Sequence, residues 1–455
     1  MHFDNKCIIF ATQQLQTTTQ LAMKLTQVTV GGYTNIDKVS MSLSKICALL
    51  AFNNYGKSNV LSAIIFGLNF ISIDTIEKRK KMASSWNLIP INNKNAGQDF
   101  LFQIEGETNV NGENTIIIYG YSFAWPHHDS APYITSEFLK IKKSGEAKFT
   151  SHIKRENNKC TYLSSTTGRC SSILKVDGDQ LAINKLSNYD ELFYIDVLKK
   201  ILNLKIVEVE ALADPKTFFR TISITDSNDA FASDINNVPD FASSAHYIYN
   251  LKKSNADKYN LFLDAVTHLI PSITDFEPVK IDLKKQVARL DGEKNIPFHL
   301  PEFVYDIRVK ERNLNQQVTI GALSSGTKKI FYLLLMTIAA EINKIPLILM
   351  EELENSIHPS LFQKLLTVLD TLAGDTKIVL TSHSPYLLQY LRPESLYVGI
   401  PNEADLAIFK KLKNSKIKNL MRDADTYEMS LGDYLFDMLL DVRGADNDVV
   451  SKFFE

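Results

Sequence analysis

The 455-residue sequence predicts an α/β protein that combines a mixed or parallel sheet with an antiparallel β lobe and an inserted, mainly helical region. Three observations predict this class. Apolar strands alternate with helices in segments 45–71 and 330–385, as in parallel α/β sheets. Segment 99–156 alternates apolar and polar residues, which is typical of an antiparallel meander. Segments 189–204 and 244–272 have apolar residues at helical spacing.

The N-terminal part of the chain predicts strands followed by a helix. Segments 25–30 and 39–44 alternate, and a GGYTN turn separates them. Segment 45–52 (KICALLAF) is continuously apolar and therefore fits a strand buried on both faces. The polar turn NNYGKS and a helix over 59–71 come directly after it. Residues 72–98 are polar and irregular, and their basic cluster Lys78–Lys81 is expected in a solvated loop.

The C-terminal part returns to alternating strands and helices. After strands within 275–320, the sequence LSSGTKK leads into a strong helix over 330–343. An apolar strand (345–350), the acidic turn EELENSIHP, a further helix and a strand over 377–385 follow. We expect five parts in the chain. They are an N-terminal extension that lacks order (1–22), a first head part (23–158), a helical insertion (159–300), a second head part (301–400) and a helical tail (401–455).

Composition narrows the class of protein. Fifty Lys and Arg against 52 Asp and Glu give a net charge of −2, so a globally basic nucleic-acid coat is not expected, although a local patch stays open. The longest apolar runs fall short of the ~18–20 residues that span a bilayer. The four cysteines form no CxxC pair, which favours free thiols in a reducing compartment. These features predict a cytoplasmic protein without a membrane partner.

The segment Ala51–Ser58 (AFNNYGKS) has the features of a phosphate-binding loop. Such a loop needs inward backbone N–H groups, a lysine for the β- and γ-phosphates and a hydroxyl for Mg²⁺, all placed between a strand and a helix N-terminus. Lys57 and Ser58 fill the two side-chain roles. Ala51 stands where a glycine is usual, and Asn54 is expected to adopt the left-handed conformation that lets the loop close. The full set of predicted nucleotide-binding residues here is Asn53, Asn54, Tyr55, Gly56, Lys57, Ser58 and Asn59.

Two further segments complete the pattern. The strand IPLILM ends in Glu351 and Glu352, where one acid can hold a metal and the next can polarise an attacking water. LSSGTKK puts Ser324, Ser325 and Gly326 at a helix N-terminus, which is an anion-binding position. His383 ends the strand that follows and can sense a phosphate or orient water.

Taken in order, AFNNYGKSN, LSSGTKK, LMEELENSIHP and TSHSP resemble the ABC-type ATPases of the SMC, RecF and OLD group of P-loop NTPases. Within that group the chain looks most like compact stand-alone prokaryotic members with an AAA-type core, several of which serve in phage-defence or toxin-like modules. The resemblance implies ATP and Mg²⁺ as cofactors. It also implies Ser58 and Glu351 as metal ligands, Glu352 as the base and His383 as the switch histidine.

In the same group, nucleotide lies between two heads, so Ser324, Ser325 and Gly326 would contact ATP held by a second copy. The resemblance thus implies a homodimer or higher oligomer and a separate effector protein controlled by ATP hydrolysis. Two alternatives stay open: a DNA-clamping repair ATPase, and a nucleotide sensor that does not hydrolyse. The long separation of Lys57 from Ser324 disfavours a transporter subunit.

Several weaker candidates favour ordinary structural roles. The run Trp125–Asp129 lacks partner ligands for a metal site, and Cys160 and Cys170 lack nearby histidines. Arg422–Asp425 has an acidic pattern similar to that of a nuclease, but no suitable strand precedes it. Gln98 is a candidate for the glutamine that ABC-type sites carry.

Overall fold

The computed structural model describes residues 23–84, 86–90, 92–110, 112–126, 131–209, 238–239, 243–282, 303–355, 357–384, 387–400, 405–441 and 452–455. The expected N-terminal extension, residues 1–22, lies outside this part. In the described chain, no helix has the length and apolar character needed to cross a membrane.

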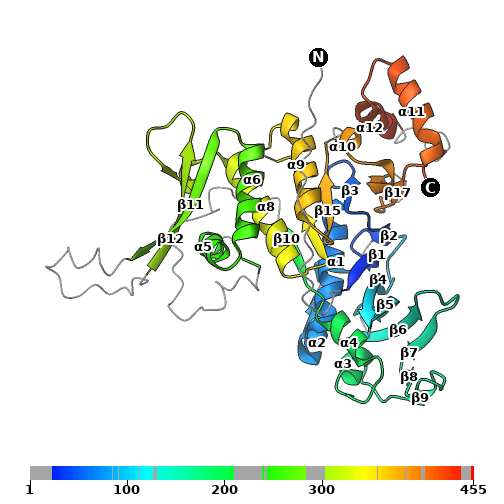
Figure 1. Cartoon of the computed structure of the whole chain (residues 1–455). Helices are drawn as coiled ribbons and strands as arrows, with labels where there is room; N and C mark the ends of the chain where they lie inside the picture. Colours follow the sequence, from blue (N-terminus) through cyan, green and yellow to red (C-terminus); the bar gives the residue numbers. More distant parts are fainter. Residues whose placement is uncertain are drawn as a thin grey trace.

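A six-stranded mixed sheet forms the centre of the molecule (Figure 1). Its order is β10-β14-β15-β3-β16-β17, and every neighbouring pair is parallel except β16 and β17. The strands are β3 (Ile46–Leu50), β10 (Ile206–Val209), β14 (Leu347–Met350), β15 (Lys377–Ser382), β16 (Leu396–Gly399) and β17 (Phe409–Lys411). The predicted alternation of apolar strands and helices therefore does build a sheet that is mostly parallel.

The central strands are buried on both faces, as their continuous apolar sequences predict. Along β3, Ala48 and Leu50 belong to one hydrophobic core, and Cys47 and Leu49 belong to the other. The first core includes residues of the helices α8 (Ser325–Ile342) and α9 (Pro359–Leu372). The second includes residues of α1 (Lys57–Ser72) and of the antiparallel lobe.

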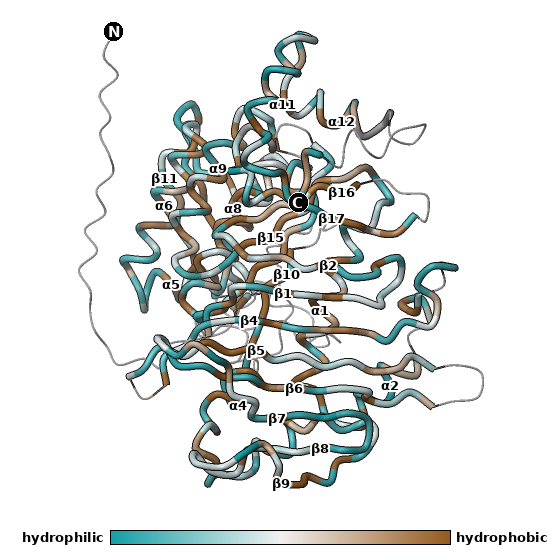
Figure 2. Tube along the Cα trace, turned by 90° about the vertical axis from the view of Figure 1, so that its right-hand side faces the viewer, coloured by the Kyte–Doolittle hydropathy of each residue, from teal (hydrophilic) through white to brown (hydrophobic). Residues whose placement is uncertain are grey.

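The antiparallel lobe is a single eight-stranded sheet, with the order β2-β1-β4-β5-β6-β7-β8-β9. Figure 2 shows β1 and β4 to β9 following one another across it. Its strands are β1 (Lys24–Tyr33), β2 (Ile36–Ser42), β4 (Phe100–Val110), β5 (Glu113–Ala124), β6 (Tyr133–Lys143), β7 (Thr150–Glu156), β8 (Lys159–Tyr162) and β9 (Ser172–Ile173). The predicted meander is confirmed, and the sheet continues past residue 158, where we expected the first head part to end.

The polar segment after α1 is not irregular, as we expected, but contains the helix α2 (Thr75–Ser84) and the short turn η1 (Trp86–Leu88). The Asp74 carboxylate accepts a hydrogen bond from the Glu77 backbone N–H at 2.8 Å and so caps α2. The prediction of a solvated loop is also wrong for Lys78, whose side chain is buried. The Lys78 Nζ donates to the carbonyls of Ile71 and Ile73 at the end of α1.

The region between the lobe and the second head part contains both helices and strands. Its elements are α3 (Ala182–Leu186), α4 (Ile195–Leu202), α5 (Ser244–Ser254), α6 (Ala256–Leu269), β11 (Ile273–Asp282), β12 (Phe303–Glu311), β13 (Val318–Thr319) and η2 (Ile320–Ala322). The single helix predicted over 244–272 is divided at Asn255, whose side chain caps α6 by accepting from the Lys258 N–H. Of 189–204, the structure makes only 195–202 helical.

The C-terminal segment folds back over the edge of the mixed sheet. It contains α10 (Leu387–Tyr390), η3 (Pro393–Ser395), α11 (Asn414–Thr426) and α12 (Leu431–Asp441) besides β16 and β17. Phe453 and Phe454 are buried, and Phe454 pairs with Leu412. The tail is therefore an integral part of the core, and it includes a strand beside the expected helices.

Candidate functional site

The residues predicted to bind nucleotide or act in catalysis lie at one edge of the mixed sheet. The strands β14, β15 and β3 are neighbours and parallel, and the register pairs Met350 with Leu380 and Leu50 with Ser382. Their carboxyl ends therefore lie together. Because the phosphate-loop segment follows β3, the acid pair follows β14 and His383 follows β15, three segments far apart in sequence share this edge.

The loop between β3 and α1 closes through two left-handed residues. Asn54 has φ 61°, as expected, and Gly56 has φ 111° at the N-cap of α1. A side chain at Gly56 would lie 2.8 Å from both the Cβ of Ala407 and the Oδ1 of Asn35, so glycine is also required by space. Ala51 is absent from the positive-φ residues, which explains why alanine can replace glycine there.

Aromatic side chains anchor this loop to the C-terminal segment. The Tyr55 hydroxyl donates to the carbonyl of Ile400 and accepts from the Ile408 N–H at 3.3 Å. The Phe52 ring lies 5.3 Å from the ring of Phe436 on α12. Tyr55 was predicted to bind nucleotide, but its side chain is engaged in packing, and only its main chain can serve the loop.

Asn59, on α1, is linked to the loop by hydrogen bonds. Its Nδ2 donates to Asn35 Oδ1 at 2.8 Å, and Asn35 Nδ2 in turn donates to the Tyr55 carbonyl at 3.2 Å. Asn59 therefore acts on the loop through Asn35, which the sequence did not single out. Asn53, Asn54 and Ser58 are exposed.

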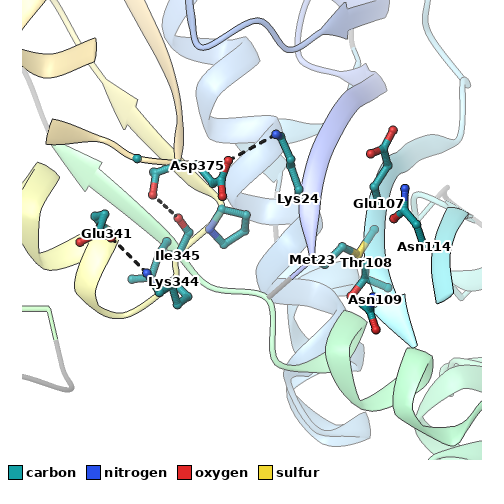
Figure 3. Close-up of a pocket in the computed structure, with 13 residues that line it drawn as sticks. Met23, Lys24, Glu107, Thr108, Asn109, Asn114, Glu341, Lys344, Ile345 and Asp375 are labelled. Atoms are coloured by element: carbon teal, nitrogen blue, oxygen red, sulfur yellow. Dashed lines mark hydrogen bonds and ion pairs between the residues drawn. The ribbon is translucent and has the colours of Figure 1, made fainter. Parts of the chain in front are cut away.

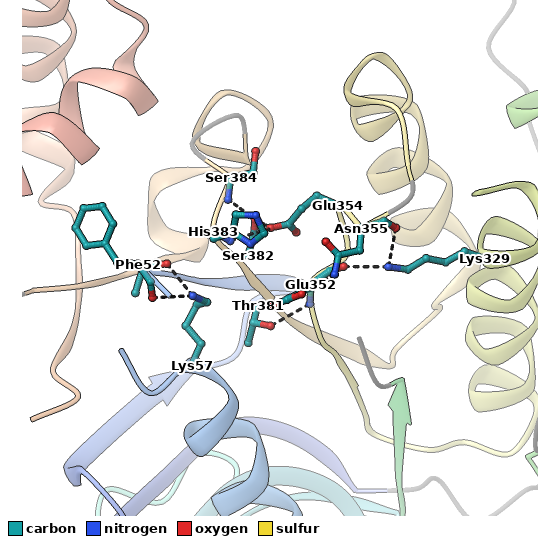
Figure 4. A network of polar contacts seen from close by, with 11 residues as sticks. Phe52, Lys57, Lys329, Glu352, Glu354, Asn355, Thr381, Ser382, His383 and Ser384 are labelled. Carbon is teal, nitrogen blue, oxygen red and sulfur yellow. Dashed lines mark hydrogen bonds and ion pairs between the residues drawn. The ribbon is translucent and has the colours of Figure 1, made fainter. Parts of the chain in front are cut away.

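Lys57 is buried with its ammonium group turned back onto its own loop. Its Nζ donates to the carbonyls of Ala51 at 2.7 Å and Phe52 at 2.9 Å (Figure 4). Burial lowers the pKa of Lys57, and the negative charges of the nearby acids, Glu352 first, oppose that shift. The lysine thus lies within the electric field of the acidic turn after β14.

The acidic turn holds Glu352 in an unusual conformation. Glu352 has φ 43°, and its backbone N–H donates to Thr381 Oγ1 at 3.1 Å. Its Oε2 accepts from Asn355 Nδ2 at 2.5 Å. Glu351 and Glu352 are both half-buried, and the Glu351 N–H donates to the carbonyl of Val209 on β10 at 2.9 Å. The carboxylate of Glu352 is therefore oriented by its own turn.

Glu354 joins this turn to the end of β15. Its Oε1 accepts from Ser382 Oγ at 2.7 Å and from the His383 N–H at 2.8 Å, and it lies 3.2 Å from His383 Nδ1. We did not predict Glu354 as a site residue. The acidic run EELE was the available signal for Glu354. Its partner His383 lies much further along the chain, so the sequence does not show that the two meet.

The Ser324–Gly326 loop lies at the exposed N-terminus of α8. Ser324 caps the helix by accepting from the Thr327 N–H at 3.2 Å. One turn further along, Lys329 Nζ donates to the carbonyls of Glu352 and Asn355, each at 2.9 Å. Figure 4 shows Lys57 and Lys329 on opposite sides of Glu352. Like Asn35 and Glu354, Lys329 is a residue of the site that we did not predict from the sequence.

The donors around the site suit Mg²⁺ only together with a ligand that brings further oxygens. Within the described residues, no group of three or more His, Cys, Asp or Glu side chains is placed to hold a metal ion. Mg²⁺ is commonly held by one or two protein oxygens together with phosphate oxygens. The Ser58 hydroxyl and the Glu351 carboxylate are oxygen donors of that kind, and they come after β3 and β14 in the chain.

The weaker candidates fall elsewhere. Trp125 is buried and donates its Nε1 to the Gly32 carbonyl at 2.7 Å, whereas residues 127–129 lie outside the described chain. The described thiols Cys47, Cys160 and Cys170 are free, as expected. Gln98 donates to Asp37 on β2, and 422–425 lie on α11.

A separate cavity of about 460 Å³ lies where the antiparallel lobe meets the turns that precede β14 and β15 (Figure 3). Lys24 pairs there with Asp375 at 3.3 Å, and Lys344 pairs with Glu341 at 3.0 Å. None of the predicted site residues lines it. It is therefore distinct from the edge where the motifs converge.

Comparison with known protein families gives one match. A family model described as "AAA domain, putative AbiEii toxin, Type IV TA system" matches residues 53–389. No curated protein matches the chain.

Solved structures similar to the chain include three SMC head domains. The first, an SMC head bound to the C-winged helix domain of ScpA, is 12% identical, with 87% of this chain and 99% of that chain covered and a TM-score of 0.49. The SMC head domain from Thermotoga maritima is 10% identical, with 86% and 100% covered and a TM-score of 0.40. An SMC head with an extended coiled coil, bound to the C-terminal domain of ScpA derived from Pyrococcus furiosus, is 12% identical, with 89% and 100% covered and a TM-score of 0.47.

Proposed function

The chain belongs to the AAA-domain family described as "putative AbiEii toxin, Type IV TA system", and from that premise we propose that it binds and hydrolyses ATP as a dimer of ABC-type heads. One observation carries the proposal. Lys57, Glu352 and His383 follow the adjacent parallel strands β3, β14 and β15, so they face one edge of the sheet. A lysine at a helix N-terminus and a carboxylate beside it are groups that phosphoryl transfer uses, and an imidazole can contact a phosphate or orient water.

Each group has a distinct role. The loop amides and the N-terminus of α1 bind the phosphates, and Lys57 leaves the carbonyls of Ala51 and Phe52 to contact them. Ser58 and Glu351 would hold Mg²⁺, which neutralises charge on the phosphate oxygens. Glu352 accepts a proton from the attacking water or orients it, and His383 contacts the terminal phosphate.

The proposed dimer follows from the location of the Ser324–Gly326 loop. Ser324 and Ser325 are exposed, and α8 reaches the acidic turn from the side opposite Lys57 (Figure 4). Its free N–H groups and helix dipole suit the phosphate of a nucleotide held by a second copy. ATP then joins two heads and hydrolysis parts them, which is a switch biased by contacts to the terminal phosphate.

We further propose that this switch regulates a separate effector protein in phage defence or a toxin-like system. The family description names a toxin and a toxin–antitoxin system, and this supports the proposal. A DNA-clamping ATPase is the second candidate. Salt-sensitive binding of a DNA duplex by the ATP-bound dimer, with a slope that reports several phosphate contacts, would favour it.

Nucleotide binding and turnover of three variants test the proposal. Glu352→Gln is expected to slow hydrolysis by ~100-fold or more while it retains ATP, because it removes the general base. It should therefore accumulate an ATP-bound dimer in size-exclusion chromatography coupled to light scattering. Lys57→Ala is expected to lose ATP affinity by equilibrium titration. Glu156→Gln, on the exposed lobe, is the matched control.

Two results would contradict the proposal. Unchanged turnover in Glu352→Gln would remove the catalytic assignment. Wild-type protein that binds ATP but shows no hydrolysis in single-turnover assays would favour a nucleotide sensor.

A further inference from the structure

Lys329 is a buried lysine on another element that contacts the acidic turn after β14. It lies on α8, and it is 5% exposed. Its Nζ donates at 2.9 Å to the carbonyl of Glu352 and at 2.9 Å to the carbonyl of Asn355. These two residues are also joined through their side chains, because Asn355 Nδ2 donates to Glu352 Oε2. One ammonium group therefore fixes the main chain at both ends of the contact that orients the Glu352 carboxylate.

The conformation of Glu352 makes this contact consequential. A φ of 43° is left-handed, which non-glycine residues rarely adopt, and such a conformation persists only where the surroundings hold it. The Thr381 hydroxyl accepts from the Glu352 N–H on one side, and Lys329 binds its carbonyl on the other. The peptide units on both sides of the Glu352 Cα are thus held from outside the turn.

The neighbouring lysine shows that this arrangement is specific to Lys329. Lys328 is 6% exposed, nearly as buried, but its Nζ donates to the Gly321 carbonyl at 3.4 Å, in the turn before α8. Burial lowers the pKa of Lys329 to about 8, and the charges of Glu354 and Glu352 oppose that shift. A lysine is therefore kept in a costly environment where its donors reach the turn of Glu352.

We propose that Lys329 is a positioning residue for hydrolysis, which sets the Glu352 carboxylate and ties it to the helix that begins at the Ser324–Gly326 loop. This inference rests on the proposed ATPase function. Because α8 carries both the loop and Lys329, one helix connects the Ser324–Gly326 loop to the turn of Glu352 in the same chain.

The test compares Lys329→Met with Lys328→Met in the full chain. For each variant, ATP affinity is measured by equilibrium titration, and kcat and KM are measured by steady-state phosphate release. Lys329→Met is expected to lower kcat by about tenfold to a hundredfold, because a small displacement of a catalytic group has an effect of that size. ATP affinity is expected to stay within about threefold of wild type, since Lys57 and its loop are untouched. Lys328→Met is expected to retain the wild-type kcat.

A double-mutant cycle separates positioning from general stability. If Lys329 acts through Glu352, adding Lys329→Met to Glu352→Gln lowers the residual kcat no further. A further drop equal to that in the single variant would overturn the inference, as would wild-type kcat in Lys329→Met. If Lys329→Met does not fold, Lys329→Gln takes its place in the same assays with the same outcomes. Wild-type protein that neither binds nor hydrolyses ATP would instead reject the proposed function.

Discussion

Glu354 Oε1 accepts a hydrogen bond from the backbone N–H of His383 at 2.8 Å and lies 3.2 Å from the Nδ1 of the same residue. One oxygen thus holds both the main chain and the imidazole. When Nδ1 donates to Glu354, Nε2 lies on the far side of the ring, where it can accept from a water or, when it is also protonated, donate to a phosphate oxygen. The pair therefore sets which nitrogen of His383 faces away from the acidic turn.

Replacing Glu354 tests this relationship. Glu354→Gln is expected to lower kcat by about tenfold or more, because it replaces a charged acceptor with an amide that no longer fixes the tautomer. Binding of ATP to the Lys57 loop should change much less, by titration of the same protein. Glu156→Gln again serves as the control, and a wild-type kcat in Glu354→Gln would exclude a role for the pair in catalysis.

The Ser324–Gly326 loop provides the second test. Ser325→Arg puts a large cation at an exposed position on the N-terminus of α8. It is expected to prevent the ATP-dependent dimer that Glu352→Gln accumulates, without loss of ATP binding by the monomer, because the loop of Lys57 is unchanged. Light scattering measures the dimer, and equilibrium titration measures ATP binding by the monomer. An intact dimer in the double variant Glu352→Gln, Ser325→Arg would show that this loop does not face a second copy.

The contact between the Phe52 and Phe436 rings provides the third test. Phe436→Ala removes the ring that packs at 5.3 Å against Phe52, and a loss of ~2 kcal/mol of stability is expected for a partly buried aromatic side chain. ATP affinity should also fall severalfold, because Phe52 belongs to the loop whose backbone N–H groups would bind the phosphates. Met421→Ala, on exposed α11, is the control. Affinity equal to wild type would show that the loop does not depend on α12.

The buried lysine of α2 predicts a pH dependence of stability. Burial lowers the pKa of Lys78 to about 8, below its value of about 10.5 in the unfolded chain. Between these values the unfolded state binds more protons, so this residue makes the free energy of unfolding rise as pH rises from 8 toward 10. The stability of wild type relative to Lys78→Met should therefore increase between pH 7.5 and 9.5 in urea denaturation. A constant difference would show that Lys78 does not titrate there.

Much of the site could be predicted from local sequence because the chain order of strands and turns carries it. Lys57, Glu352 and His383 each follow an apolar strand, and parallel strands bring their ends together. Asn54 could be predicted as left-handed from its residue type. The helix α2 was missed although Asp74 and Glu77 have the spacing of a capping pair, because the polar composition of the segment outweighed that signal.

The contacts that refine the site could not be predicted, because they join residues that only the fold brings together. Lys329 reaches a carbonyl of Glu352, and a main-chain acceptor has no sequence signature. Glu354 binds a residue on the next strand. The break at Asn255 illustrates the same limit, since apolar residues keep helical spacing on both sides of it while a polar cap ends one helix and begins another.

The anchoring of the phosphate loop limits how far the protein can be trimmed. The family model ends at residue 389, yet the groups that hold Tyr55 and Phe52 come from Ile400, Ile408 and Phe436. A fragment that contained only the matched residues would begin inside the loop. It would also lack the C-terminal residues that contact Tyr55 and Phe52. A fragment that keeps all of these contacts with the loop must therefore include the chain from Asn35 to Phe436.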